Sequence, residues 1–479
     1  MTHSDQKNSS AAERLLLLQS HLVHGDSNVA TGVRDLAEER AAASFNVVDM
    51  ADFFAGGKEA ADYMRTAYQI IRRDPILYLS TGSPFNDTQL QEREKTMAQI
   101  RRYVEISRNM KDPKQRAAFE LAMNIYSESF SMRIYVHEML FKQSFLLNGT
   151  VEQYEEWKDD IESWKCIGCY AMTELGHSSF LRGLETTAVF DRETDEFIIN
   201  SPTITSTKWW IGMAGETATH TVAICQLIID GKQYGTFWFV VQLRDYAAGR
   251  LMPGVTAGNI GPKAGRQGLD NGWIQFNGVR IPRKNMLMRW ATVTREGKFT
   301  QAPHAALSYA ALIPERLSCL FATANMCGQA ATIATRYSCV RRQGPKDEKV
   351  MDFQTQQVRL MPAVATVYVC SVVSRVMMAH WGNMTSMIND QPEEFLRLLS
   401  DVHAVSAGFK AVSTWRGSEV LEMCRRACGG HAYSAHNALA GIIGDWGVVT
   451  TGGGDNIVLT QQTAVSRHAA CIYCAEVVF

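Results

Sequence analysis

The hydrophobic periodicity of this chain changes twice, and the two changes divide it into three regions of different secondary structure. Across residues 29–164 apolar side chains recur at three- and four-residue spacing, which is typical of packed helices. Across residues 169–288 the pattern alternates as in strands, with turn signals at Asp230-Gly231 and Asn277-Gly278. After about residue 307 the helical spacing returns. A single sheet or a single helical bundle is therefore excluded.

The order of these regions predicts an α+β multidomain protein. We expect an N-terminal helical domain over residues 29–168, a central β-barrel or sandwich domain over 169–290, and a C-terminal helical bundle over 300–479. Residues 1–28 are expected to be a disordered N-terminus that includes a possible import signal. A chain of 479 residues is long enough for several domains with cores of their own.

The composition is that of an ordinary soluble globular protein, with 46% hydrophobic and 20% charged residues. A formal net charge of -1 does not favour nucleic acid or an anionic membrane surface as a partner. No apolar run approaches the roughly 20 residues that a membrane-spanning helix requires. The sequence therefore predicts neither a nucleic-acid partner nor a membrane span.

The 11 cysteines are an odd number scattered through a large chain, which favours reduced thiols over a disulfide framework. Two CxxC pairs, Cys166/Cys169 and Cys471/Cys474, could together supply four zinc ligands. The pairs lie far apart in the chain, and the nearest histidines are not at zinc-finger spacing. We expect no metal site.

Nine short motifs resemble, in the same order and at compatible spacing, the acyl-CoA oxidases of peroxisomes, which are flavoproteins related to the acyl-CoA dehydrogenases. The motifs are TELGHSSFLRGLETTA, TKWWIGMAG, IGPKAGRQGLDNG, RIPRKNML, RYSCVRRQ, DFQTQQ, RRACGGHAYS, GGGDN and QQTA. The resemblance covers nearly the whole chain. The family's usual last C-terminal helical domain is missing, because the sequence stops just after QQTA.

The resemblance implies a reaction in which an acyl-CoA thioester loses its α-proton to a carboxylate and a hydride to FAD, with O2 as the final acceptor. Most members carry this base as a glutamate near the C-terminus, at the position of Gly453 in this chain. Glycine cannot act as a base. In isovaleryl-CoA and long-chain acyl-CoA dehydrogenases the base lies instead just before an arginine on an earlier helix, which Glu315-Arg316 reproduces here.

We therefore predict that Glu315 is a relocated base and that Arg316 and Gly453 face the substrate, with Gly453 leaving room for a branched or bulky acyl chain. Glu315 has an alternative interpretation as a first-turn acid that interacts favourably with a helix N-terminus next to Pro314.

The flavin contacts implied by the resemblance fall into two groups. Thr173, Trp210 and Gly212 would meet the isoalloxazine ring. The other residues would reach the FAD of a neighbouring subunit or its far end, and they are Arg341, Gln343, Gly429 and Gly430. FAD would then lie at the interface of a homodimer or homotetramer. The alternative for Trp209 and Trp210 is that both indoles only pack.

Two further functions remain open from the sequence. The chain could be a dehydrogenase that passes electrons to an electron-transfer flavoprotein, or a catalytically silent homologue that serves as a partner subunit or CoA-binding protein.

The segment Arg14-Leu15, five residues and His21-Leu22 fits an N-terminal peroxisomal import signal, with a leucine-rich first helix as the alternative. The C-terminus shows no such signal, so the N-terminal signal would have to act alone. With this signal we expect a peroxisomal protein, and without it a cytoplasmic one.

Overall fold

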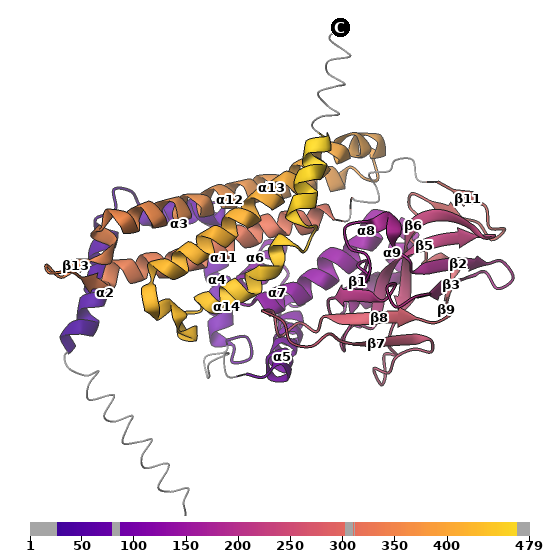
Figure 1. The fold of residues 1–479 in the computed structure, drawn as a ribbon, viewed down its shortest axis with the longest axis horizontal. Coiled ribbons are helices and arrows are strands. Elements are labelled where there is room, and N and C mark those ends of the chain that lie inside the picture. Colours follow the sequence, from indigo (N-terminus) through magenta and orange to yellow (C-terminus); the bar gives the residue numbers. More distant parts are fainter. Residues whose placement is uncertain (1–25, 79–86, 302–309, 311, 467–479) are drawn as a thin grey trace, which may run out of the picture.

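The N-terminal third of the chain is helical in the computed structural model, which describes residues 26–78, 87–301, 310 and 312–466 (Figure 1). Its helices are α2 (Asp26–Ala41), α3 (Val47–Ala55), α4 (Lys58–Arg73), α5 (Gln89–Ser107), α6 (Pro113–Tyr126), α7 (Glu128–Ile134), the π-helix η2 (Tyr135–Lys142), α8 (Gln143–Asn148) and α9 (Val151–Glu162). Capping boxes at Thr88 and Thr150 satisfy the first amides of α5 and α9. Asp112 followed by Pro113 begins α6 in a similar way.

The middle of the chain folds into two sheets that enclose one core. The strands are β1 (Gly168–Ala171), β2 (Thr187–Asp191), β3 (Glu196–Asn200), β4 (Lys208–Ile211), β5 (His220–Ile229), β6 (Lys232–Gln242), β7 (Val255–Asn259), β8 (Gly272–Phe276) and β9 (Val279–Pro282). The larger sheet runs β1-β5-β2-β3-β9 with β6 on the other side of β5, and the smaller one is β4-β8-β7. Ile211 and Ile274 from the smaller sheet pack with Phe197 and Phe239 from the larger one. The predicted sandwich is confirmed.

The larger sheet contains two hairpins, one of them at the turn signal Asp230-Gly231. β2 pairs antiparallel with β3 across the charged turn that starts at Asp191. β5 pairs antiparallel with β6, and Asp230 and Gly231 both take a positive φ at the turn between them. Positive φ at both central residues is the requirement of the tight hairpin turn whose twist matches that of the strands.

The last third is a bundle of long helices on the side of the molecule away from the two sheets (Figure 1). It contains α11 (Ile313–Val340), α12 (Gln354–Ser386), α13 (Pro392–Ala427), α14 (Leu439–Trp446) and a helix over residues 456–466. Short elements join these parts. They are β10 (Thr292–Val293), β11 (Phe299–Thr300), β12 (Arg342–Gln343), β13 (Glu348–Lys349) and the 3-10 turns η3 (Leu181–Gly183), η4 (Arg283–Asn285), η5 (Val350–Asp352), η6 (Gly429–Tyr433), η7 (Ala435–Asn437) and η8 (Gly447–Thr450).

The predicted fold class is therefore confirmed: helices, a β domain, then a helical bundle. The bundle core joins Met326 and Ala330 of α11, Leu360 of α12 and Val420 and Leu421 of α13. Small residues on α11 allow the three long helices to approach one another closely.

The outer face of α12 is apolar and exposed. Val358, Met361, Val369, Val372 and Val376 follow one another at three-, four- or eight-residue spacing and are all exposed. Among the described residues α12 is the one helix long and apolar enough to cross a membrane, and 39% of its most apolar window is buried in the protein. Because α12 packs along α11 and α13, its apolar composition is that of a bundle helix that also has an uncovered apolar stripe.

Candidate active site

Glu315 lies in the first turn of α11, directly after Pro314, and its partly buried side chain lies beside Gly453. Burial raises the pKa of the Glu315 carboxyl above its ordinary value, although Lys410, Arg316 and Arg266 act in the opposite direction. A first-turn acid that served only to stabilise the helix N-terminus would gain most from remaining ionised. The raised pKa makes the Glu315 carboxylate a stronger base than an ordinary glutamate, as acceptance of a proton requires.

Gly453 lies against this carboxyl. A Cβ atom at position 453 would be 3.2 Å from Cγ, 3.3 Å from Cδ and 3.4 Å from Oε1 of Glu315. Gly453 also has a φ of +68°, in the left-handed region that glycine adopts without strain. The structure thus brings together the two positions that the sequence singled out as alternative locations of one carboxylate.

The loop that carries Gly453 is fixed to α13 by a buried lysine. Lys410 Nζ donates to the carbonyl oxygen of Gly454 (2.7 Å) and to Asn456 Oδ1 (2.9 Å). Asn456 Nδ2 in turn donates to Thr414 Oγ1 (2.9 Å). Burial lowers the pKa of Lys410. Sequence reasoning missed Lys410, because a single lysine within a long amphipathic helix carries no motif.

Arg316 is buried and holds the start of α11 to two neighbouring helices. Its Nη1 contacts His403 Nδ1 (3.1 Å) and donates to the His403 carbonyl (3.2 Å), and its Nη2 donates to Gln462 Oε1 (3.3 Å). Burial lowers the pKa of His403 to about 4, and the Arg316 charge acts in the same direction. These contacts fix the backbone next to Glu315. The predicted substrate contact of Arg316 remains a prediction.

A second missed residue, Arg266, lies within electrostatic reach of Glu315. Its guanidinium pairs with Glu128 at 3.1 Å, and its amide donates to the Asp445 carboxylate. Burial raises the pKa of Asp445 to about 6. Arg266 has a φ of +52°, which a side-chain-bearing residue rarely adopts. Its motif was recognised in the sequence, but no role could be assigned to it.

Thr173, Trp210 and Gly212 come together at one edge of the β domain. The Trp209 amide donates to the carbonyl of Thr173 (2.9 Å), which places the Thr173 segment beside β4. Trp210 is 56% exposed and has a φ of +68°. A strained backbone that presents a flat apolar ring to the outside suits stacking on a planar ligand. Trp209 is less exposed than Trp210, so the two indoles do not both pack in the interior.

A buried ion pair holds this edge in place. Lys208 Nζ lies 3.1 Å from Glu174 Oε1, and neither side chain is exposed. Glu174 also accepts from the amides of Glu185 (2.8 Å) and Thr186 (2.9 Å). Burial opposes ionisation of Glu174, but Lys208 and these donors outweigh burial and hold the pKa of that carboxyl below its ordinary value. The pair joins the Thr173 segment to the strand that carries Trp210.

Arg341, Gln343, Gly429 and Gly430 lie elsewhere. They follow the C-terminal ends of α11 and α13, and all four are exposed. Because α11 has 28 residues, its C-terminal end is roughly 40 Å from Glu315 at the helical rise of 1.5 Å per residue. Figure 1 shows these helix ends, near β13, at the opposite side of the molecule from the two sheets of the β domain. One copy of the chain does not bring the two groups of predicted flavin residues together.

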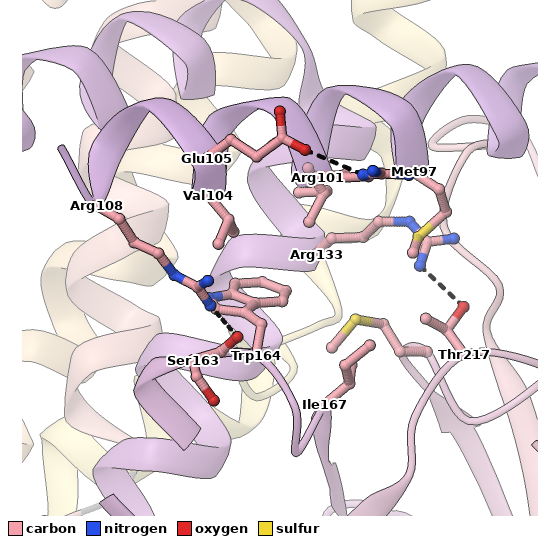
Figure 2. A pocket seen from close by; sticks show the side chains of 12 residues that line it. Met97, Arg101, Val104, Glu105, Arg108, Arg133, Ser163, Trp164, Ile167 and Thr217 are labelled. Atoms are coloured by element: carbon pink, nitrogen blue, oxygen red, sulfur yellow. Dashed lines mark hydrogen bonds and ion pairs between the residues drawn. The ribbon is translucent and has the colours of Figure 1, made fainter. Parts of the chain in front are cut away.

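A cavity of about 320 Å³ lies between α5, the segment after α9 and the loop after β4 (Figure 2). Its wall includes Val104, Trp164, Ile167 and Met213, and Arg133 borders it. Arg133 is fully engaged by Gly268, Thr217 and Asp270. None of the predicted site residues lines this cavity, so it is separate from the Glu315 site. Within the described part of the chain, no group of His, Cys, Asp or Glu side chains could hold a metal ion.

Comparisons with known proteins identify the family to which this chain is similar. Three family models match consecutive parts of the chain: "Acyl-coenzyme A oxidase N-terminal" over residues 46–167, "Acyl-CoA dehydrogenase, middle domain" over 169–279 and "Acyl-CoA oxidase, C-alpha1 domain" over 309–467. Acyl-coenzyme A oxidase 3 of Yarrowia lipolytica is 40% identical, with 91% of this chain and 64% of the relative covered. Peroxisomal acyl-coenzyme A oxidase 1 of Rattus norvegicus is 36% identical, with 90% and 65% covered.

Solved structures show the same similarity. Acyl-CoA oxidase 3 from Yarrowia lipolytica superposes with a TM-score of 0.86 at 37% identity, covering 94% of this chain and 67% of that one. Acyl-CoA oxidase 2 of Caenorhabditis elegans, bound with FAD, ascaroside-CoA and ATP, gives a TM-score of 0.83 at 32% identity, covering 90% and 65%. This chain belongs to the acyl-CoA oxidase family. It spans 62% to 64% of the length of the first curated relatives it matches.

The raised pKa of Glu315 predicts a pH-dependent effect on stability. The folded protein binds the Glu315 proton more tightly than the unfolded chain does. Ionisation of this carboxyl therefore increasingly disfavours folding as the pH rises above the pKa that Glu315 has in the unfolded chain. Glu315→Gln removes that cost. The free energy of unfolding of the variant, relative to wild type, should therefore be greater at about pH 8 than at about pH 5, as measured by denaturant unfolding.

Glu105→Gln is the control, because its arginine partners lower the pKa of Glu105 and it should show no such gain. A relative stability of Glu315→Gln that does not change with pH would mean that the carboxyl has an ordinary pKa.

Proposed function

We propose that this chain is an FAD-dependent acyl-CoA oxidase that converts an acyl-CoA to a 2-enoyl-CoA and uses Glu315 as its base. The acyl-CoA would lose its α-proton to the Glu315 carboxylate and its β-hydrogen as a hydride. FAD, when bound, accepts the hydride, and O2 takes the two electrons and two protons to give H2O2. The family supports the reaction, and the geometry around Gly453 supports the choice of base.

The contact between Gly453 and Glu315 carries the proposal. A Cβ at position 453 would lie 3.2 to 3.4 Å from Cγ, Cδ and Oε1 of Glu315, so side chains at the two positions would reach the same region of the site. A base lost from the loop and gained on α11 would therefore meet the same α-carbon. A glycine at position 453 also leaves the loop backbone open beside that carbon, which suits a branched or bulky acyl chain.

The cofactor would be held by two sets of residues. Trp210 offers a flat ring, Thr173 a hydroxyl and Gly212 a close backbone approach at the isoalloxazine end. Arg341 and Gln343, with the backbone of Gly429 and Gly430, would meet the FAD of another copy, because they lie roughly 40 Å from Glu315 in their own chain by helical rise.

A second copy would also cover exposed apolar surface. The stripe on α12 and the side chains of Phe409 and Val412 on α13 are exposed in the single chain. Apolar patches of this kind mark interaction surfaces. We propose a homodimer or homotetramer in which FAD lies at the interface.

The relative from Rattus norvegicus is named as a peroxisomal enzyme, which supports a peroxisomal location for this chain. The proposed signal, from Arg14 to Leu22, lies outside the described residues. Mislocalisation of a fluorescent fusion after Arg14→Ala and His21→Ala would support it, since receptor-read signals depend on these side chains.

Replacing Glu315 by glutamine should abolish flavin reduction by substrate. Without the carboxylate no group at this point can take the α-proton, so we expect the rate to fall roughly a hundred- to ten-thousand-fold. The measurement is anaerobic bleaching of the flavin absorbance on mixing with straight-chain and branched acyl-CoAs, followed by admission of air and assay of peroxide.

Glu120→Gln is the matched control. Glu120 is also a buried carboxyl with a raised pKa, but it lies on α6 beside Tyr103 and should leave the rate unchanged. Bleaching of Glu315→Gln at the wild-type rate would refute the base assignment. Bleaching of wild type without peroxide in air would indicate a dehydrogenase, and bound FAD that no acyl-CoA bleaches would indicate a silent homologue.

Moving the carboxyl back to the loop should restore activity. In Glu315→Gly/Gly453→Glu the atoms that a Cβ at position 453 would meet are gone. We expect faster flavin reduction than in Glu315→Gly, but slower than in wild type, because a side chain at φ +68° is strained by about 1–2 kcal/mol. If the double variant reacts no faster than Glu315→Gly, the two positions do not serve the same carbon.

The assembly can be tested by light scattering after size exclusion. Val369→Asp places a charge within the exposed stripe of α12 and should lower the mass and the FAD content together. Arg341→Ala should lower FAD content with the mass unchanged. Val151→Asp alters an equally exposed valine on α9 and serves as the control. A wild-type monomer with full FAD content would contradict the shared site.

A further inference from the structure

The cavity between α5, the segment after α9 and the loop after β4 has largely apolar walls (Figure 2). Met97, Ile100 and Val104 line it from α5, Ile167 from the segment after α9, and Met213 from the loop after β4. Its volume of about 320 Å³ is near the lower limit of small-molecule sites, roughly 300 Å³. The cavity therefore suits a small ligand with an apolar body.

Two residues of the cavity wall have a backbone conformation that large side chains rarely adopt. Trp164 has a φ of +57° and Met213 a φ of +65°, both in the left-handed region. Residues in such conformations persist only where the surrounding structure holds them, and they are frequent at sites that clamp a ligand. Here the Met213 carbonyl accepts from the Ala218 amide (2.7 Å), and the Trp164 ring lies against His137, with ring centroids 4.1 Å apart. Two strained residues in one cavity wall favour a binding site over a packing defect.

The mouth of the cavity carries a positive charge that no carboxylate compensates. Arg101 Nε donates to Glu105 Oε1 (3.1 Å), and the buried Arg133 is paired as well. Arg108, which lies at the end of α5 and is exposed, donates instead to the carbonyl of Ser163. Among the residues that the structure describes, no carboxylate pairs with Arg108. An anionic head group would gain a charge-assisted hydrogen bond here, whereas a cationic one would be repelled.

We propose that this cavity binds a medium-chain fatty acid, with its carboxylate at Arg108 and its aliphatic chain between α5 and Met213. A planar guanidinium matches the geometry of a carboxylate, and Arg108 has donors to spare after its bond to the carbonyl of Ser163. Methionine side chains adapt their shape to an aliphatic chain, and Met97 and Met213 both line the cavity. The inference goes beyond the proposed function, because it requires neither Glu315 nor a particular acyl-CoA.

The test is equilibrium dialysis of the FAD-loaded protein against radiolabelled octanoate. Excess 2-enoyl-CoA is added, since it would occupy a substrate site at Glu315. One octanoate per chain should remain bound. Octan-1-ol and octylamine are compared as probes that lack the negative charge. Both should bind roughly ten- to a hundredfold more weakly, because neither can form the charge-assisted hydrogen bond.

Two substitutions separate the head group from the chain. Arg108→Gln should weaken octanoate roughly ten- to a hundredfold and leave octan-1-ol unchanged. Val104→Trp should fill the cavity and prevent binding of both. Arg72→Gln alters another exposed arginine, on α4, and serves as the control. Because Arg108→Gln changes an exposed side chain only, it decides the question even where Val104→Trp does not fold.

The proposal would be overturned by octanoate that binds Arg108→Gln as tightly as wild type, by octylamine that binds as tightly as octanoate, or by the absence of bound octanoate. Glu315→Gln should bind octanoate as wild type does. Failure of the proposed function would instead appear in the bleaching of the flavin by acyl-CoA, which this experiment does not measure, so the two failures can be told apart.

Discussion

The carboxyl group of Glu315 occupies the space next to Gly453, and most features of the proposed site follow from this contact. It requires α11 and the loop of residues 452–455 to be fixed independently. Arg316 ties the start of α11 to His403 and Gln462, whereas Lys410 ties the loop to α13. Both anchors are buried cations that donate to protein oxygens, which compensates for their desolvation. The position of Glu315, the proposed base, is thus set within the helical bundle.

Different interactions fix the position of β4, the strand that carries Trp210. Glu174 and Lys208 form a buried pair that joins the Thr173 segment to β4 and so orients Trp210. η2 packs against α11 of the bundle and against β1 of the larger sheet, and its Val136 contacts the position of Gly212, just after β4. The remaining predicted flavin residues follow the far ends of α11 and α13, which is why we propose that they bind the FAD of a second copy.

The sequence predicted regular elements well where one periodicity extended over many residues. In α13, Pro392–Ala427, the sequence itself marks both limits, with a proline at the start and two glycines shortly after the end. The π-helix was missed, since an apolar and aromatic run such as Met132–Leu147 looks the same in either helix type. Lys410 and Arg266 were missed for a different reason. Each interacts with a residue distant in the sequence, Lys410 with Asn456 and Arg266 with Glu128, and the order of residues along the chain does not display such pairs.

By itself, the sequence indicated the family and the order of helices, strands and helices, and it displayed the glycine at position 453 and the glutamate at position 315 from which a relocated base was predicted. These are properties of residue type and spacing, which a linear chain displays directly. Only the tertiary structure decided that positions 315 and 453 meet, that Trp210 is exposed, and that the two groups of flavin residues lie at opposite ends of the molecule. Burial and contact between distant segments arise from packing, and packing also sets the pKa of Glu315.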